Sequence, residues 1–256
     1  MTEDAVLQVD VSHGVATLTL DSPANRNALS RAMRGQLRAA LADALADDAV
    51  RVVVLDHTGR VFCSGMDLSE AAGGGVQDQG VREFPELLEL IWSSPKPVVA
   101  VVRGPARAGG VGLLAACDVV VAGDSATFAF SEVRLGIVPA VISAVVLPRM
   151  VPHVAHRLML TGQVFDAEVA VGGGLVDLVV PDADVDGEVR AQLVHLTAGA
   201  PAALAETKRL LRARTPDLRF DELLELSARF FASEEGQEGI ASFREKRPAR
   251  WVPTAD

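Results

Sequence analysis

Two segments of the chain join a valine-rich run to a loop of glycine and other small residues. They cover residues 50–68 and 97–112. Continuous apolar runs of this length are typical of strands that are buried on both faces of a parallel sheet. Ligands of such sheets bind beyond the carboxyl ends of the strands, which is where both loops would lie. The two segments therefore predict an α/β fold with a site between neighbouring loops.

The stretch from Val98 to Glu132 contains the second of these loops. Its strand run is followed by a loop with Gly109 and Gly110, an apolar helix, a second valine run and the acid Glu132. Glycines let backbone N–H groups approach a ligand, and the helix N-terminus adds its dipole. With an N–H from the first loop, this arrangement would suit an oxyanion, whose donors lie about 2.7–3.1 Å away. A strand–turn–helix connection without a ligand would account for the same residues equally well.

The order of the other expected elements supports a parallel sheet. Strands at residues 6–10 and 15–20 would form a hairpin, and Ser30 would cap the helix that follows. A strand at residues 50–55 after that helix completes a β–α–β crossover. The apolar stripe of the helix consists of Met33, Leu37, Leu41 and Leu45. Further helices are expected at residues 83–93, 140–150, 154–160, 167–171, 187–197, 202–214 and 220–247, the last with a break near Ser233, and a further strand at residues 175–180.

The strand-rich part of the chain precedes a helix-rich tail. We therefore expect a core at residues 1–195 and a helical C-terminal region at residues 196–256. The net charge of −10 argues against a nucleic-acid partner. No apolar run approaches the roughly 20 residues that cross a bilayer, and the acidic N-terminus lacks the pattern of a secretory signal. These features predict a cytoplasmic protein without a membrane partner.

The cysteines and histidines give no metal-binding pattern. Cys63 and Cys117 are far apart in sequence, and in the cytoplasm we expect them to be free thiols in packed surroundings. His153 and His156 are three residues apart but have no third ligand nearby, so we interpret them as structural or surface residues. The sequence therefore predicts no metal site.

Several motifs along nearly the whole chain resemble the enoyl-CoA hydratase/isomerase family, the crotonase superfamily. They lie, in order, at residues 27–29, 62–68, 109–110, 117–118, 128–139 and 235–247. The resemblance implies an α/β fold of the crotonase type, a spiral of ββα repeats with a helical C-terminal trimerisation region. It also implies assembly into a homotrimer or a dimer of trimers.

The resemblance assigns roles to individual residues. The N–H groups of Met66 and Gly109 would form the oxyanion hole for the thioester oxygen of an acyl-CoA. Glu132 would be the catalytic acid/base, and burial among Phe128, Phe130 and Val133 would raise its pKa. Asp118 matches a structural position and is expected to be a loop or cap residue. The implied contacts with CoA or substrate come from Arg26, Ser64, Asp67, Leu68, Phe243 and Lys246. No cofactor is implied, because coenzyme A is part of the substrate.

Gly112 departs from the pattern of two-acid hydratases, which carry a glutamate three residues beyond the second oxyanion glycine. A bacterial subgroup that shares this glycine resembles the chain more narrowly, and it includes methylglutaconyl-CoA hydratase of leucine breakdown. The implied activity is reversible addition of water to a branched or carboxylated enoyl-CoA, with Arg107 or Arg134 as a partner for the carboxyl group. An enoyl-CoA isomerase, which needs a single base, and a non-catalytic CoA-binding homologue remain alternatives.

Overall fold

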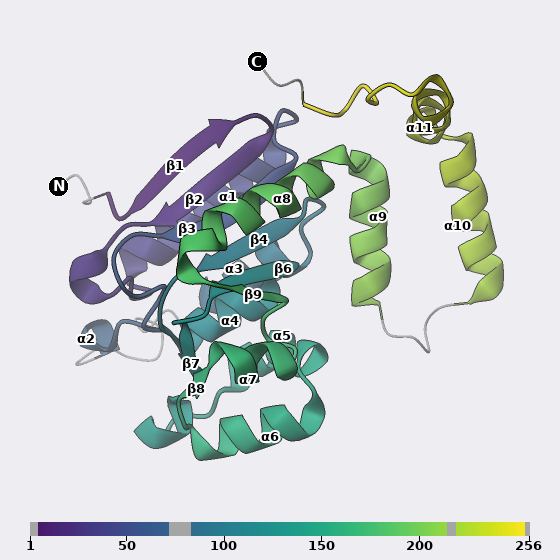
Figure 1. Ribbon diagram of the computed structural model, residues 1–256. Helices are drawn as coiled ribbons and strands as arrows, with labels where there is room; N and C mark the ends of the chain where they lie inside the picture. Colours follow the sequence, from purple (N-terminus) through teal and green to yellow (C-terminus); the bar gives the residue numbers. More distant parts are fainter. Residues whose placement is uncertain (1–4, 72–82, 214–218, 254–256) are drawn as a thin grey trace.

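The computed structural model describes residues 5–71, 83–213 and 219–253, and the glycine-rich segment at 73–75 lies outside them. Among the described residues, six strands form the main sheet, in the order β1-β2-β3-β4-β6-β9 (Figure 1). β1 and β2 pair antiparallel, and every other neighbouring pair is parallel. The strands span Leu7–Ser12, Val15–Leu20, Val52–His57, Val98–Val102, Val119–Gly123 and Leu178–Val180, respectively. The predicted hairpin and parallel sheet are therefore confirmed.

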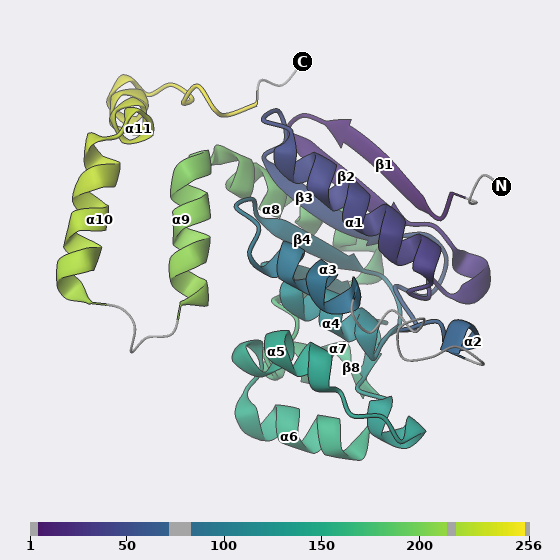
Figure 2. The ribbon, with the colours of Figure 1, turned by 180° about the vertical axis from the view of Figure 1, so that it is seen from behind.

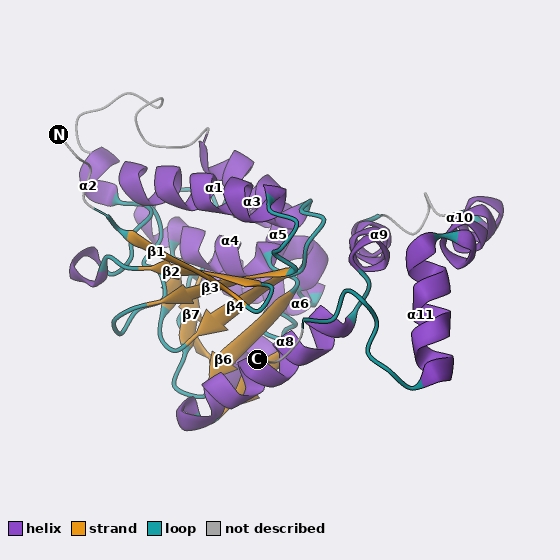
Figure 3. Cartoon of the chain, turned by 90° about the horizontal axis from the view of Figure 1, so that it is seen from above, coloured by secondary structure: helices purple, strands orange, loops and turns teal. Residues whose placement is uncertain are grey.

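The main sheet is covered on both faces. Helices α1 (Arg31–Ala46), α3 (Glu83–Trp92) and α4 (Gly109–Ala116) lie on one face, and α8 (Val185–Ala198) lies on the other (Figure 3). Every residue of β4 is buried, because its side chains point alternately into the two layers. The valine-rich runs therefore form the strands that the sequence predicts.

A small second sheet lies next to the loop that follows β4. It consists of β5 (Ala106–Arg107), β7 (Thr127–Ala129) and β8 (Phe165–Asp166). β5 pairs parallel with β7, which in turn pairs antiparallel with β8. The sheet thus ties the loop before α4 to the segment that leads to Glu132.

The remaining helices lie around the main sheet and in the C-terminal part of the chain. They are α2 (Leu68–Ala71), α5 (Ala140–Arg149), α6 (Pro152–Thr161), α7 (Ala167–Gly172), α9 (Pro201–Arg212), α10 (Phe220–Ala232) and α11 (Glu234–Glu245), with short 3-10 turns at Pro23–Asn25, Glu132–Leu135 and Asp182–Asp184. The predicted break falls at Ser233, whose hydroxyl caps α11 by accepting the N–H of Gly236 at 3.0 Å. The strand expected at residues 175–180 is shorter, because residues 175 and 176 form a buried turn before β9.

Helices α9, α10 and α11 form an arm beside the sheet (Figures 1 and 2). The domain boundary predicted at residue 195 falls within α8, near the start of this arm. The end of the chain returns to the core, since Arg51 donates 2.8 Å from Nη2 to the Gly199 oxygen and also binds the Trp251 carbonyl. The arm is therefore attached to the core at both of its ends.

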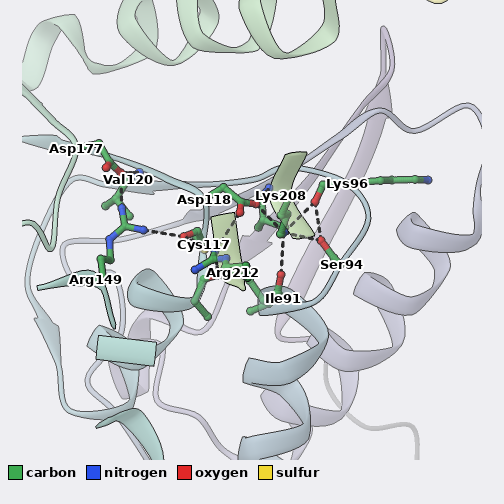
Figure 4. Close-up of polar contacts among 12 residues, drawn as sticks. Ile91, Ser94, Lys96, Cys117, Asp118, Val120, Arg149, Asp177, Lys208 and Arg212 are labelled. Carbon is green, nitrogen blue, oxygen red and sulfur yellow. Dashed lines mark hydrogen bonds and ion pairs between the residues drawn. The ribbon is translucent and has the colours of Figure 1, made fainter. Parts of the chain in front are cut away.

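A cluster of charges attaches α9 to the core (Figure 4). The ammonium group of Lys208 donates to Asp118 Oδ2 at 2.7 Å, to Ser94 Oγ at 2.9 Å and to the Ile91 oxygen at 3.1 Å. Arg212 donates to the other oxygen of Asp118 at 3.0 Å. Asp118 is a loop residue, as expected, but its ion pairs were not predicted.

Candidate active site

The two predicted loops lie side by side. Their backbones form a parallel bridge between Cys63 and Ala106, and Arg107 N–H donates to the Cys63 oxygen at 3.0 Å. A β-carbon at Gly65 would lie 3.1 Å from the Arg107 oxygen and 3.5 Å from the Gly109 nitrogen. Gly65 also has a φ of +92°, which favours glycine. The chain therefore folds so that the residue before Met66 directly contacts the start of α4.

The N–H groups of Met66 and Gly109 have no acceptor among the described residues. Gly109 is the first residue of α4, so its N–H has no acceptor within the helix. Met66 bridges to Leu29, but that bridge uses the Leu29 N–H, which donates to the Gly65 oxygen at 2.8 Å. Two neighbouring loops thus present two unused donors, one of them with the dipole of a helix behind it.

The backbone at Ala108 holds the second donor in place. Ala108 has φ +46° and ψ −116°, a strained conformation for a residue with a side chain. Its N–H donates to the Ala129 oxygen at 2.9 Å, and its own oxygen accepts the N–H groups of Val111 and Gly112 at 2.9 and 3.1 Å. These bonds fix the peptide that carries the Gly109 N–H.

Glu132 begins the 3-10 turn that follows β7. Its side chain is buried, with 8% of the residue exposed, and Oε2 has no hydrogen-bond partner among the described residues. Burial raises the pKa of the carboxyl group, and a bond to its own backbone opposes this. Phe128 and Phe130 are fully buried, as expected, but Val133 is 38% exposed. The group therefore has the environment of a proton-transferring carboxyl.

Four of the predicted contact residues, Arg26, Ser64, Asp67 and Leu68, lie in or beside these loops. Arg26 is exposed, and its carbonyl accepts the N–H of Ser64 at 3.1 Å. Asp67 accepts the hydroxyl and the N–H of Ser69 at 2.6 and 3.0 Å, so its carboxylate caps α2. Leu68, the first residue of α2, is 54% exposed. The arginine is thus free to meet a ligand at its guanidinium end, whereas Asp67 has a local structural partner.

Phe243 and Lys246 lie at the end of α11, which the views place far from α2 and α4 (Figures 1 and 2). Phe243 is 86% exposed, and Lys246 is exposed at the C-cap. Within one chain, the structure does not bring these two residues to the loops of Met66 and Gly109.

The two arginines expected near a carboxylated acyl group have other partners. Arg107 donates from Nη1 to the Thr127 oxygen at 2.7 Å and from Nη2 to the Thr127 hydroxyl at 2.9 Å. Arg134 donates to the Thr161 oxygen at 3.2 Å. The Arg107 guanidinium is therefore tied to the small sheet.

Asn27 has a role that the sequence reasoning missed, although its motif was recognised. The side chain is fully buried, and its amide donates to the Thr58 and Val61 oxygens at 2.9 and 2.8 Å. Its Oδ1 accepts the Ser22 N–H at 2.7 Å. Asn27 thus joins the loop that carries Arg26 to the loop that leads to Met66.

The described part of the chain contains neither a candidate metal centre nor a helix that could span a membrane. Within residues 5–71, 83–213 and 219–253, no three His, Cys, Asp or Glu side chains gather to hold a metal ion. No helix in the same ranges is long and apolar enough to cross a membrane. Cys63 and Cys117 are free and buried, as predicted, and burial raises the pKa of each thiol to about 12.

Comparison with known proteins gives consistent matches over the whole chain. The family model described as enoyl-CoA hydratase/isomerase matches residues 10–253. A protein of Rhodobacter capsulatus named probable enoyl-CoA hydratase is 38% identical over 96% of this chain and 97% of its own. Carnitinyl-CoA dehydratase of Proteus mirabilis is 34% identical over 80% of this chain and 82% of its own.

Comparison with solved structures indicates the same family. The crystal structure of an enoyl-CoA hydratase from Shewanella pealeana superposes with a TM-score of 0.90 and 30% identity, covering 96% of both chains. The predicted crotonase-type fold is therefore confirmed.

Proposed function

The chain belongs to the enoyl-CoA hydratase/isomerase family, and from this membership we propose that it reversibly adds water to the α,β double bond of an acyl-CoA thioester. The family supports the enzyme class of this reaction, a lyase. A relative whose printed name is carnitinyl-CoA dehydratase is consistent with chemistry in which water is removed or added. Coenzyme A enters as part of the substrate, so the proposed reaction needs no other cofactor.

One observation carries the proposal: the unused N–H groups of Met66 and Gly109 in adjoining loops. In the proposed complex, both donate to the thioester oxygen. When water attacks the β-carbon, negative charge moves through the α-carbon to this oxygen, and fixed donors stabilise the resulting enolate. Each such donor typically contributes about 2.7–4 kcal/mol to lowering the barrier.

Glu132 is the proposed acid/base. Its ionised carboxylate takes a proton from water as the oxygen bonds to the β-carbon, and the resulting acid delivers that proton to the α-carbon. The unpartnered Oε2 supports this role, because it leaves one buried oxygen able to bind water or substrate. The raised pKa supports it as well, since a carboxyl group with a pKa nearer to neutrality both gives and takes protons efficiently.

The same carboxyl also suits isomerisation of the double bond. That reaction moves one proton between two carbons and needs a single base, a role that the buried carboxyl group of Glu132 can fill. A CoA-binding protein without activity is the remaining alternative. The resemblance points to a branched or carboxylated acyl group, and the residues around Gly112 bear on that choice.

The C-terminal helices are the proposed site of trimer formation. They expose large apolar side chains that a single chain leaves uncovered, which is unusual for a monomer. The most exposed are Phe220, Phe243, Leu211, Leu224 and Phe231, at 92%, 86%, 79%, 71% and 67%. In the proposed trimer, or dimer of trimers, Phe243 and Lys246 contact the CoA of a neighbouring subunit, while Arg26, Ser64, Asp67 and Leu68 contact the substrate of their own subunit.

Turnover of crotonyl-CoA and 3-methylglutaconyl-CoA, followed by loss of the conjugated thioester absorbance, tests the proposal. Hydration that Glu132→Gln abolishes supports the hydratase. Conversion of a 3-enoyl-CoA to the conjugated isomer, without hydration, would instead identify an isomerase. Binding of acyl-CoA without turnover of any of these substrates would reject both activities in favour of the binding protein.

A further inference from the structure

Gly112 lies on the third position after Gly109, in the first turn of α4. A β-carbon at Gly112 would lie 2.5 Å from Cγ2 and 3.2 Å from Cβ of Ile142. A β-carbon essentially never lies within 3.0 Å of a non-bonded heavy atom, so any side chain at position 112 would have to displace Ile142. The isoleucine therefore fills the direction in which the glutamate of a two-acid hydratase would extend.

Ile142 is one member of an apolar wall. It belongs to the first turn of α5, and only 3% of it is exposed. The ring of Phe84 lies 3.5 Å from the same β-carbon position of Gly112 and 3.3 Å from that of Gly109. Leu29 Cδ1 lies 3.1 Å from the Gly109 position. Side chains from α3, from α5 and from the loop before α1 thus cover the first turn of α4, which begins with the proposed oxyanion donor Gly109.

We propose that Ile142, together with Phe84, takes the place of the missing acid and determines which acyl groups the site accepts. The accepted groups are hydrocarbon chains, straight or branched near the β-carbon, without a charged end. This inference rests on the proposed function, because it assumes that an acyl thioester binds at Gly109.

A carboxylated acyl group is disfavoured at this wall. Leu29, Phe84 and Ile142 offer no hydrogen-bond donor, and a buried carboxylate without a partner is strongly disfavoured. The Arg107 guanidinium is held by Thr127, so a carboxylate could recruit it only by breaking those bonds. A hydrocarbon group that packs against the same wall needs no hydrogen-bond partner there and gains from burial.

Binding of non-reacting, saturated thioesters tests this inference separately from turnover. Titration calorimetry on the full-length protein would use butyryl-, isovaleryl-, octanoyl- and glutaryl-CoA. We expect isovaleryl-CoA to bind at least about 10-fold more tightly than glutaryl-CoA, since one misfitting group in a site typically changes affinity by about 10- to 200-fold.

The variants are Ile142→Ala and the smaller change Ile142→Val, which keeps the fold if the alanine variant does not. Ile142→Ala should improve octanoyl-CoA relative to butyryl-CoA by about 10-fold, and Ile142→Val should act in the same direction by less. The matched control is Leu147→Ala, a similar truncation at a 48% exposed position of α5, which should leave the preference unchanged.

Equal or tighter binding of glutaryl-CoA would overturn the inference, as would an unchanged acyl preference in both Ile142 variants. Failure of all four thioesters to bind would overturn it as well. If the preference follows expectation but no enoyl-CoA is turned over, the inference stands as a statement about binding and the hydratase proposal fails. If turnover occurs without the expected acyl preference, the hydratase proposal stands and the inference about Ile142 fails.

Discussion

Lys208 of α9 and Asp118 at the end of α4 form an ion pair of 2.7 Å, although 90 positions separate them in sequence. Lys208 is only 6% exposed, and burial lowers its pKa while Asp118 opposes that shift. Asp118 also accepts the Val98 N–H at 2.8 Å and binds Arg212. One carboxylate, in the loop between α4 and β6, thus connects the C-terminal arm to β4. Figure 4 shows its contacts with Lys208 and Arg212.

Removal of either partner should have unequal effects. Asp118→Ala leaves Lys208 charged and buried without its counter-charge, so it should destabilise the protein by about 3–5 kcal/mol. Lys208→Met should cost less, because Asp118 keeps Arg212 and the Val98 N–H. Thermal unfolding of all three proteins measures the difference. The proteins are compared at one concentration, because the stability of the proposed trimer would depend on it. A larger loss for Lys208→Met would contradict this account of the cluster.

The close approach of Gly112 and Ile142 predicts that alanine at position 112 destabilises the protein. Gly112→Ala should destabilise by about 1–3 kcal/mol, because overpacking outweighs the better helix propensity of alanine. Gly35→Ala in α1 is the matched control. A β-carbon there would meet nothing within 4 Å, so we expect stabilisation of about 0.5–1 kcal/mol.

A double-mutant cycle isolates this contact. Ile142→Ala alone should cost about 2–5 kcal/mol through the cavity that it leaves. In the protein with both Gly112→Ala and Ile142→Ala, the new methyl group occupies part of that cavity, so the loss should be smaller than the sum of the two single losses. Strict additivity in urea unfolding would show that these positions do not touch.

Several elements could be predicted because their signals are local. The buried strands β3 and β4 follow from continuous valine runs, and the break between α10 and α11 follows from the capping residue Ser233. The contact of Gly112 with Ile142 could not be predicted, because it depends on how α5 packs on α4 and leaves no local pattern. The contact of the chain end with Arg51 spans 200 positions and leaves no local pattern in the sequence either.

In the candidate site, too, features with a local sequence signal could be predicted and features set by tertiary contacts could not. Gly109 was expected at a helix start and Glu132 near a strand end, and the structure places them there. Arg107 or Arg134 was expected to partner a substrate carboxyl group. The structure shows the Arg107 guanidinium bound to Thr127, next to the pairing of β5 with β7. That pairing joins a strand of two residues to a strand of three, and both are too short to produce a recognisable sequence pattern.

The N–H donor of Met66 can be deleted without removing a hydrogen bond to any described residue. Met66→Pro eliminates an N–H that has no acceptor among the described residues, so we expect kcat to fall about 10²- to 10³-fold. Met66→Leu keeps the N–H and much of the side-chain volume, and it should retain kcat within a few-fold. Steady-state kinetics on crotonyl-CoA, with circular dichroism to confirm folding, checks both variants. Equal losses in the two would assign the effect to the side chain instead.

The buried carboxyl of Glu132 predicts how activity depends on pH. Hydration requires the ionised base, and burial raises its pKa above the ordinary value of 4.5. The acidic limb of the profile of kcat/KM against pH should therefore have its midpoint above 4.5. A midpoint at or below that value would show that another group controls the limb.

Stability should depend on the same group, and the sign follows from the direction of the pKa shift. A carboxyl whose pKa is raised by folding favours the folded state most when protonated, and this contribution is lost as the pH rises through the folded pKa. Glu132→Gln stays neutral throughout. Relative to the wild type, it should therefore gain thermal stability as the pH is raised from below 4.5 toward neutrality. Melting temperatures of both proteins across this range test the linkage, and a difference independent of pH would mean that Glu132 ionises as easily in the folded chain as in the unfolded one.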